Sequence, residues 1–473
     1  MLTDADIIEA LKGFRPEWAD QVITAAVVDS RLAVAGCLFV ALPGEHHDGH
    51  NFIGEAFKKG ARLAFVQNDL SGRFPTLDLR GKDIPTVPVY PAAPLCLRVD
   101  DCLLALQQAA RFWRRKLDLK VIGITGSVGK STTKELVAEV LSQRYRTLKN
   151  QGNLNNEIGL PLTILSLNEQ HERAVLEMGF YVPGEIALLC DLAQPAIGVI
   201  TNIGTVHAER AGTQEDIARG KSELIQALPS APEGVAILNY DDPWVRNMSR
   251  LTNARVFFYG LDPQSDLWAD GVEGLGLEGI RFRLHYQREV IHLRIPLIGR
   301  HSVHAALRAS AVGLADGLTW QEIVEGLRSG RAQLRLMTAR TEEGALILDD
   351  SYNASPESTL AALNLLEELE GRKIAVLGDM LELGIYEMEG HEKVGARAAV
   401  VADLLIAVGE RAKIIASAAE QAGLPHEALL VLPDVPQVID YLKEHLEKGD
   451  VVLVKGSHGM HMERIVAALE AHS

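Results

Sequence analysis

Residues 121–135, VIGITGSVGKSTTKE, combine the residue types that bind the phosphates of a nucleotide. An apolar run ends at Thr125, two glycines follow, and Lys130 and Ser131 open a stretch with helical periodicity. Backbone N–H groups in such a turn converge, and the N-terminus of the following helix adds positive potential. The lysine can reach the terminal phosphates, and the Ser131 hydroxyl suits Mg²⁺. These features predict a phosphate-binding loop.

The spacing within this loop differs from the standard G-x-x-x-x-G-K-[ST] pattern, which requires glycine at position 124, where the chain has isoleucine. A purely structural glycine-rich turn between a strand and a helix is therefore the alternative interpretation. The hydroxyls of Thr125, Thr132 and Thr133 favour phosphate binding, because hydroxyls cluster where oxyanions and a hydrated metal would lie.

Two further residues follow apolar runs that have the character of strands. Glu177 ends RAVLE, and His207 comes after IGVITNIG. Because ligands bind beyond the carboxyl ends of strands in an open parallel sheet, both side chains should face the rim that carries the loop. This favours metal binding over two solvated loop residues. Lys221, in the helical stretch EDIARGKSELIQAL, is by itself typical of a surface charge.

A second candidate rim lies nearer the C-terminus, in LILDDSYNASPES at 346–358. Asp350 and Asn353 follow a strand there, and Arg335 lies on the approach to it. An arginine close to a nucleotide can stabilise charge that develops during phosphoryl transfer. A surface arginine and a simple Asx-type turn account for the same residues equally well.

The elements that must position these residues alternate between short apolar strands and helical stretches, which predicts an α/β protein with mostly parallel sheets. Irregular composition before residue 98 and near residue 330 predicts three domains. These are a small N-terminal α/β domain at 1–98, a central phosphate-loop ATPase-type parallel-sheet domain at 99–330, and a C-terminal Rossmann-like doubly wound domain at 331–473. A helix cap at Thr3 and Asp6 should start the first domain.

The composition restricts the class of protein. The chain has 473 residues, 47% of them hydrophobic and 23% charged, with a formal charge of −16. An acidic chain without a long basic run argues against nucleic-acid binding and against an anionic membrane surface. We expect no membrane insertion and no signal peptide. Four scattered cysteines indicate a reducing compartment, so we expect a cytoplasmic protein.

Taken together, these motifs resemble the Mur ligases, ATP-dependent amide-forming enzymes of bacterial cell-wall synthesis. That family's loop has the form T-G-x-x-G-K-[ST]-[ST], which the chain matches from Thr125 to Thr132. Residues 29–52 resemble a uridine-nucleotide-binding N-terminal domain. Four stretches are similar to the branch that adds D-alanyl-D-alanine, namely 150–165, 349–358, 376–384 and 453–463.

The resemblance implies a ligase that uses ATP to activate a carboxylate as an acyl phosphate and joins D-Ala-D-Ala to UDP-MurNAc-tripeptide. We also expect a monomer. The alternatives are a family member that adds a single amino acid and a nucleotide-binding regulator that does not ligate. The implied catalytic residues are Lys130, Glu177, His207, Lys221, Arg335 and Asp350. The implied ATP-binding residues are Thr125, Gly126, Ser127, Val128, Gly129, Lys130, Ser131, Thr132, Arg335, Asp350 and Asn353.

The resemblance also implies metal and substrate contacts. Two Mg²⁺ ions would be held by Ser131, Glu177, His207 and Lys221, the last as a carbamate formed with CO₂, which reverses the interpretation of Lys221 as a surface charge. The implied substrate-binding residues are Ser30, Arg31, Asp48, Gly49, His50, Asn153, Asn155, Asn156, Tyr352 and Lys455. The family's G-x-H-N-x-x-N pattern is changed at 299–305, where Ser302 and Ala305 replace both asparagines, so the backbone or His304 should serve the adenine instead.

Overall fold

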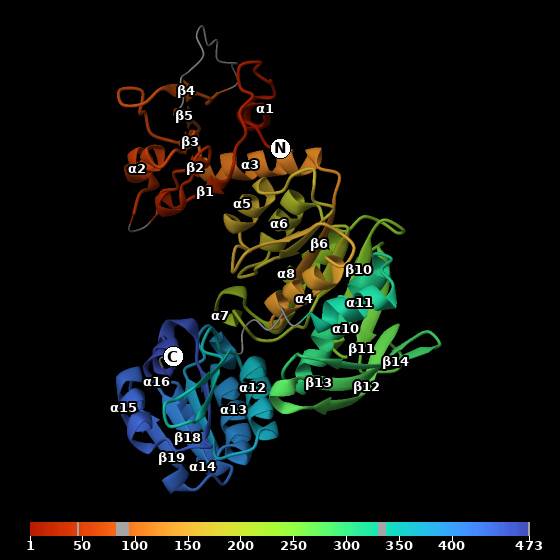
Figure 1. Cartoon of the computed structure of the whole chain (residues 1–473), viewed down its shortest axis with the longest axis vertical. Helices are drawn as coiled ribbons and strands as arrows, with labels where there is room; N and C mark the ends of the chain where they lie inside the picture. The colour runs from red at the N-terminus through yellow and green to blue at the C-terminus, as the bar shows by residue number, and fades with distance from the viewer. Residues whose placement is uncertain (45–46, 82–93, 330–336, 472–473) are drawn as a thin grey trace. The chain divides into compact units, whose positions relative to one another are not determined.

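The computed structural model describes the chain except residues 45–46, 82–93, 330–336 and 472–473 (Figure 1). The described residues form two compact units. The first unit comprises 1–123, 145–179 and 185–196, and the second comprises 124–144, 180–184 and 197–473.

The first unit begins with α1 (Asp4–Lys12) and a five-stranded sheet. The helix starts at a capping box, in which the Asp6 N–H donates to the Thr3 hydroxyl and the Thr3 N–H donates to the Asp6 carboxylate, as predicted. The strand order is β1-β2-β3-β5-β4, and every pair is parallel. The elements are β1 (Ala26–Val27), β2 (Leu38–Val40), α2 (Ile53–Lys58), β3 (Leu63–Val66), β4 (Thr76–Asp78) and β5 (Leu95–Arg98).

The rest of the first unit supplies one candidate metal ligand. It contains α3 (Cys102–Lys116), β7 (Thr147–Lys149), α5 (Gly159–Leu165), β8 (Arg173–Glu177) and α6 (Glu185–Ala193). Strands β7 and β8 pair in parallel, and Glu177 is the last residue of β8, at its carboxyl end. The predicted boundary at residue 98 coincides with the last residue of β5, just before the connection to α3.

The middle part of the second unit carries the phosphate loop. Neighbouring strands β9 to β12 are parallel, and β13 and β14 then extend the sheet in antiparallel fashion. The strands are β6 (Lys120–Thr125), which begins in the first unit, β9 (Ile197–Ile200), β10 (Val235–Asn239), β11 (Arg255–Gly260), β12 (Leu267–Gly274), β13 (Ile280–Tyr286) and β14 (Glu289–Ile295). Helices of this part include α4 (Lys130–Leu141), α7 (Ala208–Ala211), α8 (Gln214–Gln226), α10 (Val303–Ala315) and α11 (Trp320–Arg328).

The C-terminal part of the second unit is a six-stranded sheet of order β15-β16-β20-β17-β18-β19, parallel except for β15. Its strands are β15 (Met337–Arg340), β16 (Leu346–Asp349), β17 (Lys373–Gly378), β18 (Leu404–Val408), β19 (Leu429–Leu432) and β20 (Val451–Lys455). Its helices are α12 (Pro356–Glu368), α13 (Glu387–Val401), α14 (Ala412–Gln421), α15 (Val435–His445) and α16 (Glu463–Leu469).

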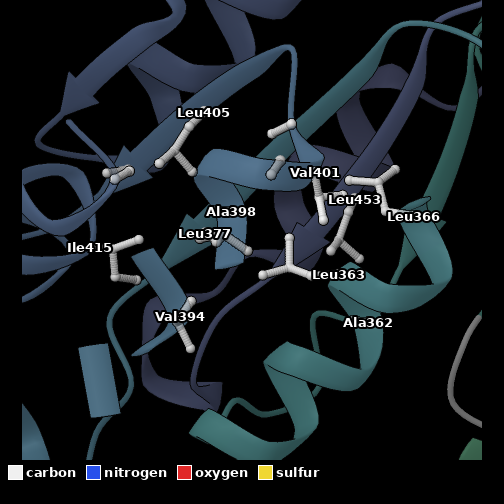
Figure 2. Close-up of a cluster of buried hydrophobic side chains, with 14 of the residues drawn as sticks. Ala362, Leu363, Leu366, Leu377, Val394, Ala398, Val401, Leu405, Ile415 and Leu453 are labelled. Atoms are coloured by element: carbon white, nitrogen blue, oxygen red, sulfur yellow. The ribbon is translucent and has the colours of Figure 1, made fainter. Parts of the chain in front are cut away.

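Alternating side chains of this sheet enter two separate cores. Leu377 and Leu405 pack with residues of α12, α13 and α14, as Figure 2 shows, whereas Val376 and Ile406 pack with α15 and α16. Successive strand residues point to opposite faces, so a strand buried on both sides requires helices on both sides. The prediction of a doubly wound C-terminal domain is thus confirmed.

The predicted fold class, three α/β domains with mostly parallel sheets, is confirmed. The boundaries at residues 98 and 330 stay predictions, and the second lies outside the described residues. Within the described part of the chain, no helix is long and apolar enough to cross a membrane.

Candidate active site

The loop between β6 and α4 has the shape of a phosphate-binding turn. Gly126 and Gly129 hold positive φ angles of 146° and 84°, which residues with a side chain rarely adopt. A Cβ at Gly126 would overlap the buried hydroxyl of Thr201, which has no hydrogen-bond partner among the described residues. Glycine is therefore required there, and the backbone is left open to a close approach.

Asn202 fixes this loop, and sequence reasoning missed it. The Asn202 side chain accepts from the Val128 N–H at 3.0 Å and donates to the Val128 carbonyl at 3.1 Å. Its backbone carbonyl accepts from the Ser127 N–H at 2.9 Å, and the Ser127 hydroxyl accepts from the Gly204 N–H at 2.8 Å. The loop is thus tied to the segment that follows β9, which also leads to His207.

Two lysine ammonium groups share one carbonyl oxygen inside the loop. Lys130 Nζ donates to the Gly126 carbonyl at 2.9 Å, and Lys221 Nζ donates to the same oxygen at 3.1 Å. Lys221 is only 1% exposed, and its Nζ lies 4.5 Å from the centre of the Phe180 ring. The surface-charge interpretation of Lys221 is therefore wrong, because α8 turns this residue inward. Two cations in so small a space suit a ligand of high negative charge.

The hydroxyl residues after Lys130 begin α4, and a second unpredicted residue supports them. The Thr133 hydroxyl donates to the Gly129 carbonyl at 2.6 Å and accepts from Arg308 Nε at 2.8 Å. Arg308 is buried, and its Nη1 also donates to the Tyr259 hydroxyl at 3.3 Å. An arginine within the apolar stretch of α10 was the signal for such a role, since buried charges in proteins are normally paired. Ser131 is buried as well.

His207 lies at the start of α7 in the left-handed region, with φ of 67°. Its Nδ1 is 2.7 Å from Glu382 Oε2, and its ring packs against that of Tyr181 in a T-shaped arrangement with centroids 4.7 Å apart. Burial lowers the pKa of His207, the hydrogen bond to Glu382 opposes this shift, and the positive charges of Lys130 and Lys221 reinforce it. Burial therefore favours the neutral ring, which is the form that binds metal ions.

Glu177, in the first unit, is 2% exposed and held on both its backbone and its side chain. Its N–H donates to Asn150 Oδ1 at 2.9 Å, and Asn155 Nδ2 donates to its Oε1 at 3.0 Å. The structure therefore brings Asn155 to Glu177. Asn156 instead accepts the Gly159 N–H at 2.9 Å at the start of α5, and Asn153 is exposed.

In the C-terminal part, Asp350, Asn353 and Lys455 form one cluster. Lys455 Nζ donates to Asp350 Oδ2 at 2.6 Å and to the Asn353 carbonyl at 2.8 Å, although Lys455 is only 2% exposed. Tyr352 is exposed, with its ring centroid 5.9 Å from that of His458. Arg335 lies outside the described residues, so its role stays a prediction.

The predicted substrate residues near the N-terminus have local partners. The Ser30 hydroxyl donates to Glu55 at 3.0 Å, and Arg31 pairs with Asp29 while its side chain stays 83% exposed. His50 uses both ring nitrogens, since Nδ1 donates to Asp48 at 2.6 Å and Nε2 accepts the Gln67 N–H at 2.9 Å. A Cβ at Gly49 would crowd the Leu42 backbone. Asp48, Gly49 and His50 thus shape the turn, and Arg31 presents its charge to solvent.

His304, which was expected to substitute near the adenine, is paired within the middle part of the second unit. Its Nε2 lies 3.0 Å from Asp241 Oδ2, and Asp241 also accepts the N–H groups of Leu261 and Asp262. Burial raises the pKa of Asp241, but the hydrogen bond from His304 and the two N–H groups lower it by more. An ionised carboxylate therefore anchors the turn that follows β11.

Comparison with known proteins identifies the family. Models described as "Mur ligase family, catalytic domain", "Mur ligase middle domain" and "Mur ligase, glutamate ligase domain" match residues 22–93, 124–313 and 331–458. The UDP-N-acetylmuramoyl-tripeptide–D-alanyl-D-alanine ligase of Bacillus subtilis is 38% identical over 99% of this chain and 98% of its own length. The chain belongs to the Mur ligase family.

Other Mur ligases agree with this assignment. The Escherichia coli protein of the same name is 34% identical over 96% of this chain and 95% of its own. A crystal structure of MurF from Acinetobacter baumannii has a TM-score of 0.82 and 32% identity, with 98% of each chain covered. MurF from Thermotoga maritima, solved in complex with ADP, has a TM-score of 0.77 and 28% identity over 94% of this chain and 96% of that one.

The residues of this Mur ligase fit a nucleotide and magnesium. The unpartnered Thr201 hydroxyl, the side-chain-free surface at Gly126 and the two ammonium groups suit phosphate oxygens. Within the described residues no cluster of three or more His, Cys, Asp or Glu could hold a metal by itself. Mg²⁺ typically takes one or two carboxylates together with waters and substrate phosphates, and the candidate ligands Ser131, Glu177 and His207 include one carboxylate.

One buried histidine supports the C-terminal loop 379–384. His391 is 0% exposed, its Nδ1 donates to the Glu387 carbonyl at 2.7 Å, and its Nε2 accepts the Met380 N–H at 3.1 Å. Burial lowers the pKa of His391 in the folded chain, so as the pH falls the unfolded chain takes up the proton first. The stability it contributes is complete above the unfolded pKa, about 6.5, and is lost as the pH falls toward the folded pKa, by up to about 1.4 kcal/mol per pH unit.

We therefore expect acidification from about pH 7 to about pH 5 to destabilise the wild-type C-terminal sheet more than that of His391→Gln, which keeps an acceptor but cannot titrate. Hydrogen exchange of peptides from β17 and β20 measures the free energy of opening. His426→Gln, at a side chain 88% exposed, should behave as wild type. Equal pH slopes in wild type and His391→Gln would show that His391 does not contribute.

Proposed function

We propose that the chain joins D-alanyl-D-alanine to UDP-N-acetylmuramoyl-tripeptide and converts ATP to ADP and phosphate, giving UDP-MurNAc-pentapeptide for peptidoglycan synthesis. This proposal rests on the match, over nearly the whole chain, to relatives that are named for this activity and are 34% to 38% identical. The built phosphate loop and the buried Lys221 support the same reaction. We further propose that it acts as a monomer in the cytoplasm, where ATP is available.

The chemical problem is that a carboxylate does not react with an amine, because oxide is a poor leaving group. In the proposed reaction the terminal carboxylate of the tripeptide attacks the γ-phosphorus of ATP, and ADP leaves. The amine of D-Ala-D-Ala then attacks the acyl carbon of the acyl phosphate, and phosphate leaves. Lys130 neutralises charge as the two anions approach each other, which is a task of positioning and electrostatics. Asp350, Asn353 and Arg335 would contact the nucleotide from the C-terminal domain.

Mg²⁺ would supply charge neutralisation and orientation of the phosphates. Ser131 and Glu177 would hold one ion and His207 the second. We propose that Lys221 is carbamylated by CO₂, which turns a cation into an anionic oxygen donor. The geometry supports this: two ammonium groups on one carbonyl oxygen repel each other, whereas a carbamate would attract both Lys130 and a metal ion.

We propose that the substrate's uridine nucleotide binds the N-terminal domain through Ser30 and Arg31, on the turn shaped by Asp48, Gly49 and His50. Asn153, Asn155 and Asn156 would line the path of the tripeptide, and Tyr352 and Lys455 the site of the dipeptide. The exposed guanidinium of Arg31 supports the nucleotide site, and the hydrogen bond from Asn155 to Glu177 supports the tripeptide path.

A paired substrate assay tests the reaction. With ATP and Mg²⁺, we expect phosphate release from UDP-MurNAc-tripeptide plus D-Ala-D-Ala to exceed by at least about 10²-fold that from UDP-MurNAc-dipeptide plus diaminopimelate or lysine, because a site built for one acceptor leaves polar groups unpaired with another. Release with the dipeptide pair alone would assign a single-amino-acid ligase. No release with either pair would favour a regulator that does not ligate.

A further inference from the structure

A carboxylate of the C-terminal domain lies against the imidazole of His207. Glu382 belongs to the stretch 379–384 that follows β17, and its Oε2 is 2.7 Å from His207 Nδ1. Both residues lie in the second compact unit. The His207 side chain is 17% exposed and that of Glu382 is 36% exposed, so the contact is partly sheltered from water.

Both residues adopt unfavourable backbone conformations to make this contact. His207 has φ of 67° and Glu382 has φ of 63°, values that residues other than glycine rarely adopt. Such conformations persist where the surroundings impose them, and they concentrate at functional sites. The Glu209 N–H donates to the Glu382 carbonyl at 3.2 Å, so the backbones are joined as well.

The support behind Glu382 comes from two motifs to which the reaction assigns few roles, at 376–384 and 453–463. The Met380 N–H donates to His391 at 3.1 Å, and the Leu381 N–H donates to the Ser457 hydroxyl at 2.8 Å. The Ser457 N–H in turn donates to the Asp379 carbonyl at 3.0 Å. The three residues before Glu382 are therefore fixed by hydrogen bonds to groups elsewhere in the domain. These bonds hold the backbone that orients the Glu382 carboxylate.

A carboxylate on Nδ1 decides which nitrogen of a neutral imidazole carries the proton. The carboxylate can only accept, so Nδ1 must donate, and Nε2 then keeps its lone pair. A carboxylate or carbonyl on the far nitrogen is the usual partner of a histidine that binds metal, and it fixes both the tautomer and the orientation of the ring. The Tyr181 ring packs against the imidazole in a T-shaped arrangement and limits its movement.

We propose that Glu382 is a positioning residue that holds His207 as the Nδ1–H tautomer and directs Nε2 toward a divalent cation. This inference rests on the proposed function, which assigns His207 to the second Mg²⁺. It adds that the metal-binding form of a middle-domain histidine depends on a carboxylate of the C-terminal domain.

The test uses the full-length chain with ¹⁵N-labelled histidine. Glu382→Asn is the main variant, because asparagine tolerates positive φ but its side chain is too short to reach His207. Glu382→Gln keeps an acceptor without the charge. Glu389→Gln is the matched control, since Glu389 is exposed on α13 and pairs with Lys393. The His207→Gln spectrum identifies the His207 signals.

In metal-free protein at about pH 8, where histidine is neutral, we expect wild type, Glu382→Gln and Glu389→Gln to show the Nδ1–H tautomer. In Glu382→Asn the signals should move toward the Nε2–H form. Mn²⁺ titration with β,γ-methylene-ATP should show that Glu382→Asn weakens one class of sites by about 10–100-fold, with Glu382→Gln intermediate.

Unchanged His207 signals in Glu382→Asn would overturn the proposal, and so would equal Mn²⁺ affinity in Glu382→Asn and Glu389→Gln. Should Glu382→Asn not fold, loss of the Nδ1–H tautomer in Glu382→Gln would overturn it too, because that variant keeps the acceptor. The tautomer is read without turnover. If the wild-type chain does not ligate but the Nδ1–H tautomer is lost in Glu382→Asn, only the proposed function is refuted. If the wild-type chain ligates and the tautomer is unchanged in Glu382→Asn, only the role of Glu382 is refuted.

Discussion

Replacing Lys130 with methionine should lower kcat by about 10²–10³-fold, the usual cost of removing one group that stabilises developing charge. The Lys130 ammonium lies inside the loop, 2.9 Å from the Gly126 carbonyl and 3.1 Å from that of Ser127, where the phosphates are proposed to bind. Methionine has a similar length without the charge. Initial rates of phosphate release at saturating UDP-MurNAc-tripeptide, ATP and D-Ala-D-Ala measure the effect.

Two variants separate charge from geometry at this position. Lys130→Arg keeps the charge, but its planar fork cannot place a point charge between the two carbonyls, so we expect it to recover only part of the rate. Lys413→Met removes an exposed lysine that pairs with Glu410, and it should retain full activity. A Lys130→Met enzyme within threefold of wild-type kcat would remove Lys130 from the proposed mechanism.

The strand–loop–helix around Lys130 could be predicted because its signals are local. An apolar run, two glycines and a helix start lie within fifteen residues, and each is a matter of backbone preference. Burial of Lys221 could not be predicted in that way. Its neighbours on α8 include acidic and basic residues, and only the packing against Phe180 shows which face is inward. The resemblance to the family supplied what periodicity could not.

Contacts between distant segments account for most of what the sequence did not reveal. Arg308 and Thr133 are 175 residues apart, as are Glu382 and His207. No local pattern relates such pairs, because the fold alone brings them together. The antiparallel strand β13 is a different case, because its signal is local. Buried Ile280, Phe282 and Leu284 alternate with the exposed Arg281 and Arg283, which is the period-2 pattern of a strand with one buried face.

Replacing Lys455 with methionine should destabilise the C-terminal sheet by about 3 kcal/mol, the lower end of the cost of breaking a buried ion pair. Lys455 is 2% exposed at the end of β20, and its ammonium donates to Asp350 Oδ2 and to the Asn353 carbonyl. The variant removes the cation and leaves the carboxylate in a site where its side chain is only 19% exposed. We expect the lower end of this range of free energies because the exposed part of the Asp350 carboxylate can be hydrated. Hydrogen exchange of peptides from β16, β17 and β20 gives the free energy of opening.

The double variant Asp350→Asn with Lys455→Met decides whether charge or packing is responsible. If the loss comes from a carboxylate without its cation, neutralising it should recover more than half of the stability, because a buried ion pair replaced by neutral groups of similar size costs little. Lys413→Met, at an exposed pair, should cost less than about 1 kcal/mol. A double variant as unstable as Lys455→Met would mean that the lysine acts through packing and through its bond to the Asn353 carbonyl.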